Sequence, residues 1–355
     1  MRIAVIGAGS WGIALASTLH QNGHEVSLWA RDQAVADAIT NTNRHPKYLP
    51  GIVLPPGLTC TSDLQSALSG SDVCIFAVAS EAALTMMELS HPYMPETCLL
   101  VHAIKGFEFP TLQRMSELLL DNFDQSSERV AVIAGPSHAE EVARQMPTTL
   151  VVAAFSQNTA EAVQDILMAP HLRVYTNPDV IGTEIGGTLK NIIALGVGIA
   201  DGMGFGDNAK AALMTRGLAE ITRLGIAMGA SAMTFAGLSG VGDLIVTCTS
   251  EHSRNFRAGQ LLGQGKRVDE AITEIGMAVE GIRSTRAAKM LSQLHNVDMP
   301  ITCVMFDVLF RAKSVKVAVS ELMGRARNHE VEEVAQSDLS KQWLFPAPPD
   351  FSGTR

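Results

Sequence analysis

The chain opens on a short apolar strand that runs into a glycine-rich turn, and no other feature constrains its fold more. The β-branched run 3–6 predicts a strand, residues 15–19 continue a helical pattern, and the apolar run 25–30 predicts a second strand. Strand, turn, helix and second strand together form one βαβ unit. A unit of this kind predicts an α/β domain in the first part of the chain.

Three glycines are spaced within this turn as they are in dinucleotide-binding sites. Gly7 is expected to make the tight turn, Gly9 to let a pyrophosphate approach the backbone, and Gly12 to let the helix pack closely on the strand. The N-terminus of the helix then offers free N–H groups to the anion. We therefore predict a nucleotide site here; the alternative is a tight βα turn that binds no ligand.

The residue after the second strand bears on which dinucleotide is bound. An acidic residue at this point holds the ribose hydroxyls in NAD-specific enzymes. Here Arg31 comes first and Asp32 follows it. A guanidinium can pair with a 2′-phosphate through two hydrogen bonds, so we predict a preference for NADP(H) with some use of NAD(H). The alternative is that Arg31 is a solvated charge.

Length and composition restrict the class of protein. A chain of 355 residues is too long for one ordinary core, which predicts two domains. Its 46% hydrophobic and 18% charged residues are typical of a soluble globular protein. The net charge of −9 argues against a nucleic-acid partner. The 5 cysteines and 10 histidines lack the spacing of metal ligands, so no metal is predicted.

Targeting signals are not predicted either. The fingerprint starts at the first residue, which leaves no room for a signal peptide. The longest apolar stretch, 192–200, is far shorter than the roughly 20 residues of a membrane span. These features predict a cytoplasmic protein without membrane insertion.

The pattern of elements divides the chain into two domains and a tail. Up to about residue 180, apolar strands alternate with helices, which predicts a Rossmann-type doubly wound sheet over 1–180. Strand patterns then give way to helices, so 181–336 is predicted to be an all-α substrate-binding and catalytic domain; the Pro-rich end, 337–355, is predicted to be a disordered tail. Strands are predicted over 72–78, 98–104, 129–134, 148–154 and 172–175, and helices over 111–122, 139–144, 159–167, 184–200, 208–227 and 268–275.

Polar residues or glycines follow three of the predicted strands, at the edge where open α/β sheets bind ligands. Ala79 and Ser80 follow the strand 72–78. Lys105 comes directly after an apolar strand, so its ammonium is expected to emerge where an anion would lie. The turn 135–139, Gly-Pro-Ser-His-Ala, would present N–H groups at the start of a helix. The alternative for Lys105 is a lysine that ends a strand in solvent.

Two ionisable residues of the helical half have unusual surroundings. Lys190 lies among apolar and small residues. It either reaches solvent along its own side chain or faces a cleft with its pKa lowered by burial, as a proton donor and acceptor near neutral pH. Asp243 ends a glycine-lined stretch that would let its carboxylate approach a neighbour closely.

The segment 247–255 groups hydroxyls, an arginine and an amide. Arg254 could bind a phosphate through two hydrogen bonds, with Ser253 and Asn255 as further donors. The alternative is a polar surface loop.

Six motifs in this order resemble those of bacterial NAD(P)-dependent sn-glycerol-3-phosphate dehydrogenases, over roughly residues 1 to 335. The Lys-Asn and Ser-Arg-Asn motifs are more specific than the glycine fingerprint. One departure is Ala79, where the family usually has proline. The motifs are Gly-Ala-Gly-Ser-Trp-Gly (7–12), Lys-Gly (105–106), Gly-Pro-Ser (135–137), Leu-Lys-Asn-Ile-Ile-Ala-Leu-Gly (189–196), Gly-Val-Gly-Asp (240–243) and Cys-Thr-Ser…Ser-Arg-Asn-Phe (248–256).

The resemblance implies a role for individual residues. Lys190 would be the general acid in reduction and the base in oxidation. The spacing of Thr247, four residues after Asp243, would let it form a hydrogen bond within the same cluster. Substrate would be bound by Lys105, Gly135, Ser137, Lys190, Asp243, Ser253, Arg254 and Asn255. The cofactor would be bound by Gly7, Gly9, Ser10, Trp11, Gly12, Arg31, Lys105, Ala139, Arg254, Val279 and Glu280.

The resemblance also implies the reaction: hydride exchange between the cofactor and sn-glycerol 3-phosphate or dihydroxyacetone phosphate, which supplies glycerophospholipid synthesis. The expected partner is a small phosphorylated substrate, and apolar helices make a homodimer an expectation as well. Two rival functions stay open. One is a dehydrogenase of the same architecture that acts on another β-hydroxy acid, which the Ser-Arg-Asn motif fits poorly. The other is a dinucleotide sensor without turnover, for which the two lysines would be unnecessary.

Overall fold

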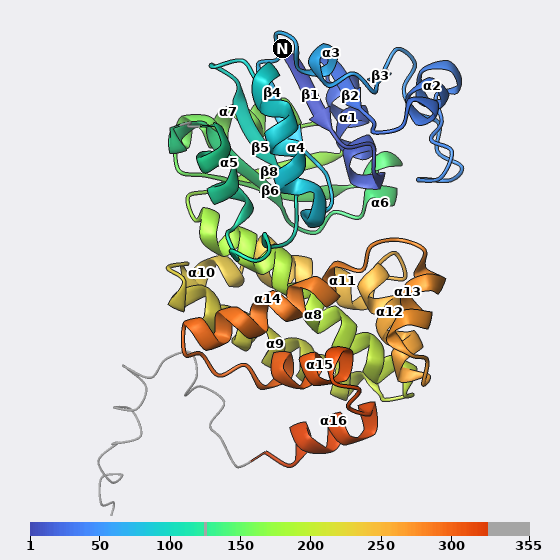
Figure 1. Cartoon of the computed structure of the whole chain (residues 1–355), viewed down its shortest axis with the longest axis vertical. Coiled ribbons are helices and arrows are strands. Elements are labelled where there is room, and N and C mark those ends of the chain that lie inside the picture. Colours follow the sequence, from blue (N-terminus) through green and yellow to red (C-terminus); the bar gives the residue numbers. More distant parts are fainter. Residues whose placement is uncertain (124–125, 326–355) are drawn as a thin grey trace, which may run out of the picture.

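The computed structural model describes residues 1–123 and 126–325. A sheet covered by helices forms one part, and a group of helices that begins with α8 forms the other (Figure 1). The predicted tail, 337–355, lies outside the described residues, as does the end of the predicted second domain from residue 326. Helix α8 begins at Val180, beside the predicted division, which itself stays a prediction.

One eight-stranded sheet, in the order β3-β2-β1-β4-β5-β6-β7-β8, holds the strands of the described residues. All neighbouring strands pair in parallel except β6 and β7, which are antiparallel. The strands are β1 (Arg2–Ile6), β2 (Glu25–Trp29), β3 (Thr59–Thr61), β4 (Val73–Phe76), β5 (Leu99–His102), β6 (Val130–Ala134), β7 (Thr148–Ala154) and β8 (Leu172–Asn177).

The predicted Rossmann-type fold is confirmed, but two features of the sheet were not predicted. Strand β3 has only three residues, too few to show an alternating pattern. Strand β7 runs against β6 because the helix between them, α6 (Ala139–Ala143), has five residues and spans only about 7.5 Å at 1.5 Å per residue. A helix this short does not carry the chain back across the sheet to start a parallel strand.

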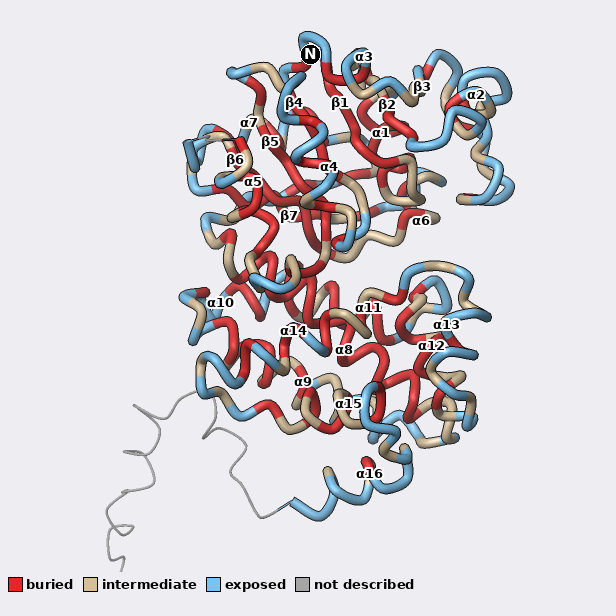
Figure 2. Tube along the Cα trace, in the orientation of Figure 1, coloured by how far each residue is buried: buried red, intermediate tan, exposed pale blue. Residues whose placement is uncertain are grey.

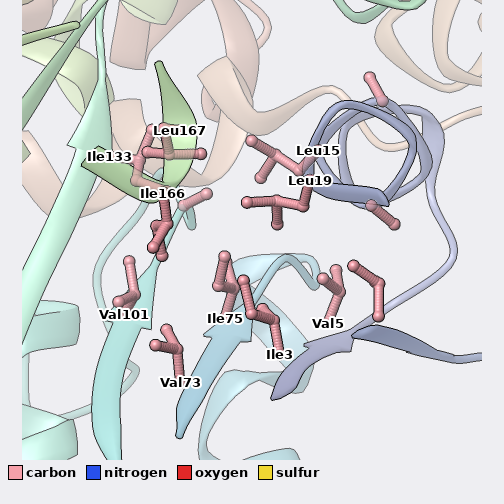
Figure 3. Packing of buried hydrophobic residues seen from close by; sticks show 14 of the residues in the cluster. Ile3, Val5, Leu15, Leu19, Val73, Ile75, Val101, Ile133, Ile166 and Leu167 are labelled. Atoms are coloured by element: carbon pink, nitrogen blue, oxygen red, sulfur yellow. The ribbon is translucent and has the colours of Figure 1, made fainter. Parts of the chain in front are cut away.

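Helices cover both faces of the sheet, and successive strand residues point to opposite faces. Ile3 and Val5 of β1 pack with α1, α6 and α7, as Figure 3 shows for α1 and its surroundings, whereas Ala4 and Ile6 pack with α3, α4 and α5. The helices of this part are α1 (Ser10–Gln21), α2 (Gln33–Thr42), α3 (Leu64–Leu68), η1 (Ser80–Ala82), α4 (Ala83–Ser90), η2 (His91–Tyr93), α5 (Met115–Phe123), η3 (Ser127–Arg129), α6 and α7 (Gln157–Leu167).

The second part is helical throughout its described residues and is built around α8 (Val180–Gly202). Figure 2 shows α8 as a buried trace among the helices that surround it. The others are α9 (Asp207–Ala227), α10 (Ala232–Phe235), the π turn η4 (Leu238–Gly242), α11 (Asp243–Thr249), α12 (Arg254–Gly263), α13 (Val268–Ile275), α14 (Glu280–Leu294), α15 (Pro300–Phe310) and α16 (Val315–Met323).

Close packing against α12 explains why α8 is rich in glycine. A Cβ at Gly198 would overlap the Phe256 carbonyl, and one at Gly259 would overlap the Leu195 carbonyl. By length and composition, α8 and the segment Ala232–Thr249 could each cross a membrane. The prediction that 192–200 is the longest apolar stretch is therefore wrong. For α8, 94% of the apolar window is buried inside the protein, which is typical of a core helix.

Candidate active site

The glycine turn has the geometry that its spacing predicts. Gly7 has a φ of 118°, which disfavours other residues, and a Cβ there would lie 2.7 Å from the Ala77 carbonyl oxygen. A Cβ at Gly12 would overlap the carbonyl oxygen of Gly7. At Gly9, by contrast, a Cβ would meet nothing within 4 Å. Gly7 and Gly12 are therefore required by packing, while Gly9 borders open space in front of α1.

The N-terminus of α1 fits a bound pyrophosphate. Its N-cap is Gly9, no side chain caps the first turn, and that turn contains no acidic residue. Ser10 and Trp11 are its first residues, so their N–H groups stay available to an anion. The turn therefore offers what the diphosphate of a dinucleotide needs.

The two charged residues after β2 behave differently. Arg31 is exposed. The Asp32 carboxylate accepts a hydrogen bond of 2.9 Å from the Ala34 N–H and caps α2. One carboxylate oxygen of Asp32 is thus engaged in the helix cap, whereas the guanidinium of Arg31 is free to meet a phosphate.

A charged cluster joins the two parts of the chain. The Lys190 ammonium on α8 donates to the carboxylate of Asp243 and, at 2.8 Å, to the Thr247 hydroxyl, both on α11. The Lys105 ammonium, on the loop after β5, lies 3.6 Å from the same carboxylate. Because Lys190 is 4% exposed and Asp243 1% exposed, the alternative that Lys190 reaches solvent is wrong. Lys105 faces this cluster.

The protonation of Lys190 is finely balanced. Burial lowers the pKa of Lys190 from 10.5 to about 7; the Asp243 carboxylate opposes this shift and the neighbouring Lys105 adds to it. Thr247 also donates to the backbone carbonyl of Asp243 at 2.6 Å, which fixes the hydroxyl beside the ammonium. An amine with such a pKa can give and take a proton near neutral pH.

The turn after β6 approaches this cluster. Gly135 has a φ of 109°, and the Ser137 hydroxyl donates to its carbonyl at 2.9 Å. The His138 ring lies 3.4 Å from the Val246 carbonyl of α11, and burial lowers its pKa. Ala139 starts α6 and is buried in the core of the first part.

The Ser-Arg-Asn segment begins α12 and is not a solvated loop. Ser253 caps this helix by accepting from the Phe256 N–H at 3.2 Å and is 4% exposed. The amide of Asn255, 8% exposed, donates to Asn191 and accepts from the Gly281 N–H, both at 2.9 Å. Arg254 is half-buried, and its guanidinium donates to the Ala278 carbonyl at 2.9 Å.

The N-terminus of α14 contacts the sheet part at η1. Glu280 accepts a 2.9 Å hydrogen bond from the Ser80 hydroxyl, and burial raises the pKa of Glu280. Val279 precedes it as the buried N-cap. Arg283 and Glu81 form an ion pair of 3.1 Å. Sequence patterns missed Glu81 and Arg283, and indicated Ser80 only as a polar residue that follows a predicted strand.

The loop before η1 keeps its shape without the proline that the resemblance led us to expect. Ala79 has φ −65° and ψ 147°. A φ near −65° is the value that the ring of proline enforces. The departure at Ala79 therefore leaves the local backbone as a proline would set it.

Comparison with known proteins decides the family. A family model described as NAD-dependent glycerol-3-phosphate dehydrogenase N-terminus matches residues 2–160, and the model of the corresponding C-terminus matches 179–320. A protein of Pelotomaculum thermopropionicum named Glycerol-3-phosphate dehydrogenase [NAD(P)+] is 53% identical, over 94% of this chain and 96% of its own. The chain belongs to the NAD-dependent glycerol-3-phosphate dehydrogenase family.

Further members of the glycerol-3-phosphate dehydrogenase family support the assignment. A Bacillus velezensis protein of the same name is 49% identical over 95% of this chain and 98% of its own. The crystal structure of glycerol-3-phosphate dehydrogenase from Coxiella burnetii superimposes with a TM-score of 0.87 at 36% identity, covering 91% of this chain and 99% of that one. The resemblance stated from the motifs is thus confirmed.

A rival family shares only the architecture. A ketopantoate reductase from Ralstonia eutropha has a TM-score of 0.54 and 19% identity, over 83% of this chain and 99% of its own. Identity this low indicates a common fold and nothing more. The glycerol-3-phosphate dehydrogenase family therefore accounts for this chain far better than the other dehydrogenases of similar build.

Proposed function

We infer that this chain is a glycerol-3-phosphate dehydrogenase [NAD(P)+], an oxidoreductase that interconverts sn-glycerol 3-phosphate and dihydroxyacetone phosphate. The observation that carries this function is the cluster of buried Lys190 and Asp243 with half-buried Lys105, which lies between the nucleotide-binding part and the helical part. The name and 53% identity of the Pelotomaculum protein support the substrate.

The cofactor would be held by the turn 7–12 and the start of α1. Lys105 would contact it from the loop after β5, and Arg254, Val279 and Glu280 from the helical part. We propose NADP(H) as the preferred form and NAD(H) as a weaker one. Exposed Arg31 at the end of β2 supports this preference, and Asp32 supports it too because its carboxylate already caps α2. When bound, the nicotinamide supplies or accepts the hydride at C2 of the substrate.

Lys190 carries the proton chemistry in this proposal. In reduction, negative charge develops on the C2 oxygen, and a cation within hydrogen-bond reach both stabilises it and supplies the proton. The Lys190 ammonium fulfils both tasks, and in oxidation the neutral amine takes the proton back. Asp243 and Thr247 hold the ammonium in place, while Lys105 adds positive charge to the same space.

The substrate phosphate is assigned to the start of α12. The Arg254 guanidinium carries the charge there, and the Ser253 hydroxyl can donate to an oxygen while it accepts from the Phe256 N–H. Asn255 keeps one amide hydrogen beyond its bond to Asn191. Gly135 and Ser137 would contact the substrate from the sheet part.

The wider setting belongs to the same proposal. The product glycerol 3-phosphate would supply glycerophospholipid synthesis in the cytoplasm. A homodimer is proposed through the helical part, because large apolar side chains are exposed on it: Met233 is 78% and Leu294 is 73% exposed. A second copy of the chain that covered these side chains would remove apolar surface from water.

The test follows NADPH absorbance after addition of dihydroxyacetone phosphate, with unphosphorylated dihydroxyacetone as the control. We expect oxidation with the phosphate ester only. Equal rates with both compounds would refute the phosphate site. Binding of NADPH without turnover of either would refute the proposed reaction and favour the sensor.

A further inference from the structure

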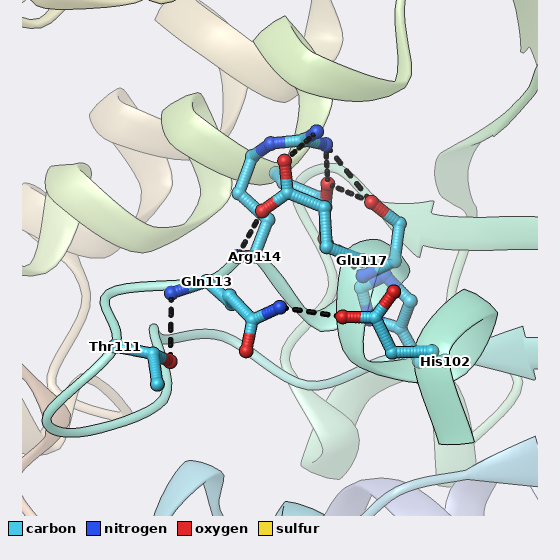
Figure 4. A network of polar contacts seen from close by, with 8 residues as sticks. His102, Thr111, Gln113, Arg114 and Glu117 are labelled. Carbon is cyan, nitrogen blue, oxygen red and sulfur yellow. Dashed lines mark hydrogen bonds and ion pairs between the residues drawn. The ribbon is translucent and has the colours of Figure 1, made fainter.

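A second buried charged cluster lies on α8, at Glu184. Its carboxylate accepts hydrogen bonds from the Arg114 guanidinium at 2.6 Å, from the Ser116 N–H at 2.8 Å and from the Ser116 hydroxyl at 2.7 Å. The His102 ring lies 3.2 Å from the same carboxylate. Every residue in this group is at most 8% exposed. Figure 4 shows Arg114 and His102 in this network, with Glu117 as a second carboxylate that Arg114 binds at 2.6 Å.

The partners of Glu184 all belong to the sheet part of the protein. His102 ends β5, three residues before Lys105, and Ser116 is in the first turn of α5. Glu184 itself lies six residues before Lys190 on the same helix, about 9 Å along its axis. The network therefore joins the strand that leads to Lys105 to the helix that carries Lys190.

We propose that Glu184 is a positioning residue, which fixes α8 against β5 and so sets the place of Lys190 opposite Lys105 and the substrate. This inference rests on the proposed function, because it assigns Glu184 to that reaction. An α-helix is a stiff element with its side chains at fixed intervals, so a shift of its anchored end moves Lys190 with it. Glu184 contributes no proton and acts through Lys190 alone.

The charge on Glu184 is held firmly. Burial by itself would raise the pKa of Glu184, but hydrogen bonds and charges from His102, Arg114 and Ser116 outweigh it and lower that pKa to about 2. The carboxylate is thus ionised at neutral pH. Its loss would leave Arg114 with the more exposed Glu117 as its remaining carboxylate, and would leave Ser116 and His102 without their shared acceptor.

A matched control exists on α9. Glu220 is also a buried carboxyl group, 2% exposed. It accepts from the Ile301 N–H at 2.6 Å and from the N–H and the hydroxyl of Thr302, both at 3.1 Å. These partners start α15, inside the helical part. Burial raises the pKa of Glu220 to about 7, so this carboxyl is only partly ionised at neutral pH. Replacing Glu220 with Gln therefore changes a similarly buried and hydrogen-bonded carboxyl group without touching the contact between α8 and β5.

The experiment compares wild type, Glu184→Gln and Glu220→Gln as full-length enzymes, by steady-state kinetics and thermal unfolding. We expect Glu184→Gln to lower kcat by about ten- to a hundredfold with the KM for NADPH unchanged, since misplacing a catalytic group by about 1 Å costs up to about 10²-fold. Glu220→Gln should lose stability but keep kcat. The double variant Arg114→Gln/Glu184→Gln removes both charges and should fold if the single variant does not, with kcat still low.

Unchanged kcat in the Glu184 variants overturns the proposal, and so does a loss of kcat that Glu220→Gln shares at equal loss of stability. A second readout does not need turnover: acylation of Lys190 by acetic anhydride, located by peptide mass spectrometry. It should be faster in Glu184→Gln than in wild type and Glu220→Gln, and equal rates would overturn the proposal. Wild type that binds NADPH but does not reduce dihydroxyacetone phosphate refutes the proposed reaction instead, and the acylation rates then decide whether Glu184 places Lys190.

Discussion

Helix α8 carries two buried charged clusters six residues apart, and they are built in opposite ways. Around Glu184, one carboxylate meets a guanidinium, an imidazole and hydroxyl and amide donors, and its pKa falls to about 2. Around Lys190, two ammonium groups share the carboxylate of Asp243, and the pKa of Lys190 falls to about 7. In the first cluster, one carboxylate is surrounded by donors from the protein itself. The second keeps an excess of positive charge, which suits a site that must receive an anion and move a proton.

The largest effect in this comparison of the two clusters is expected at Lys190. Lys190→Ala should lower kcat by about 10²–10⁴-fold, the usual contribution of general acid–base catalysis. NADPH affinity, measured by fluorescence titration, should change little because the glycine turn is untouched. Near-normal turnover would remove Lys190 from the mechanism and leave the two clusters without a difference in role.

Truncation at Glu184 should add a large loss of stability to its loss of kcat. Glu184→Ala should destabilise the protein by about 3–5 kcal/mol, because it leaves Arg114 buried with part of its charge uncompensated. The pKa of Glu184 is lower in the folded state, so its contribution is present above the ordinary value of 4.5 and is lost as pH falls toward 2. In urea unfolding, the difference between wild type and Glu184→Gln should therefore shrink on acidification. A constant difference would contradict the assignment.

The proposed phosphate site at the start of α12 should depend on positive charge as well. Arg254→Ala should raise the KM for dihydroxyacetone phosphate by about ten- to a hundredfold, since a hydrogen bond to a charged group is worth about 1.5–3 kcal/mol. Unphosphorylated dihydroxyacetone serves as the control. If both compounds lost activity equally, the phosphate would have to bind elsewhere.

The pH dependence of kcat sharpens the contrast further. Reduction needs the protonated Lys190, so its kcat should fall as pH rises through about 7, and oxidation should show the reverse trend. Asp243 raises the pKa of Lys190, so Asp243→Asn should move the midpoint for reduction to lower pH. A midpoint that stays in place in this variant would separate Asp243 from the protonation of Lys190.

The smallest effect is expected at the cofactor side. Arg31→Asp should shift the ratio of kcat/KM from NADPH toward NADH, because a carboxylate repels the 2′-phosphate and accepts from the ribose hydroxyls. The control is kcat at saturating cofactor, which should stay near the wild-type value. An unchanged ratio would show that another residue reads the 2′-phosphate.

The parts of this fold that were predicted from the sequence depend on local patterns. Strands β1, β2 and β7 and helices α1, α8 and α9 were predicted because apolar periodicity and turn glycines are properties of neighbouring residues. Strand β3 and the antiparallel course of β7 were missed, because three residues carry no periodicity and strand direction depends on how far a connection reaches.

The residues of the candidate site also divide into those that local patterns indicated and those that they did not. Lys190 was noticed as an ionisable residue in an apolar helix, but the sequence left open whether it faces solvent or a cleft. The answer depends on Asp243, 53 residues away, and on Thr247, 57 residues away. Arg114 and Ser116 gave no signal at all, since each lies about 70 residues from Glu184 and none of the three belongs to a recognisable motif.

By itself, the sequence determined the βαβ opening, the change to helices after residue 180, and the family, because each rests on the identity and spacing of residues close along the chain. Only the tertiary structure decided that Lys190 is buried against Asp243, and that Glu184 joins α8 to the strand that leads to Lys105. The physical reason is that both clusters depend on desolvation and on short contacts between distant segments. Neither property exists until the chain has folded.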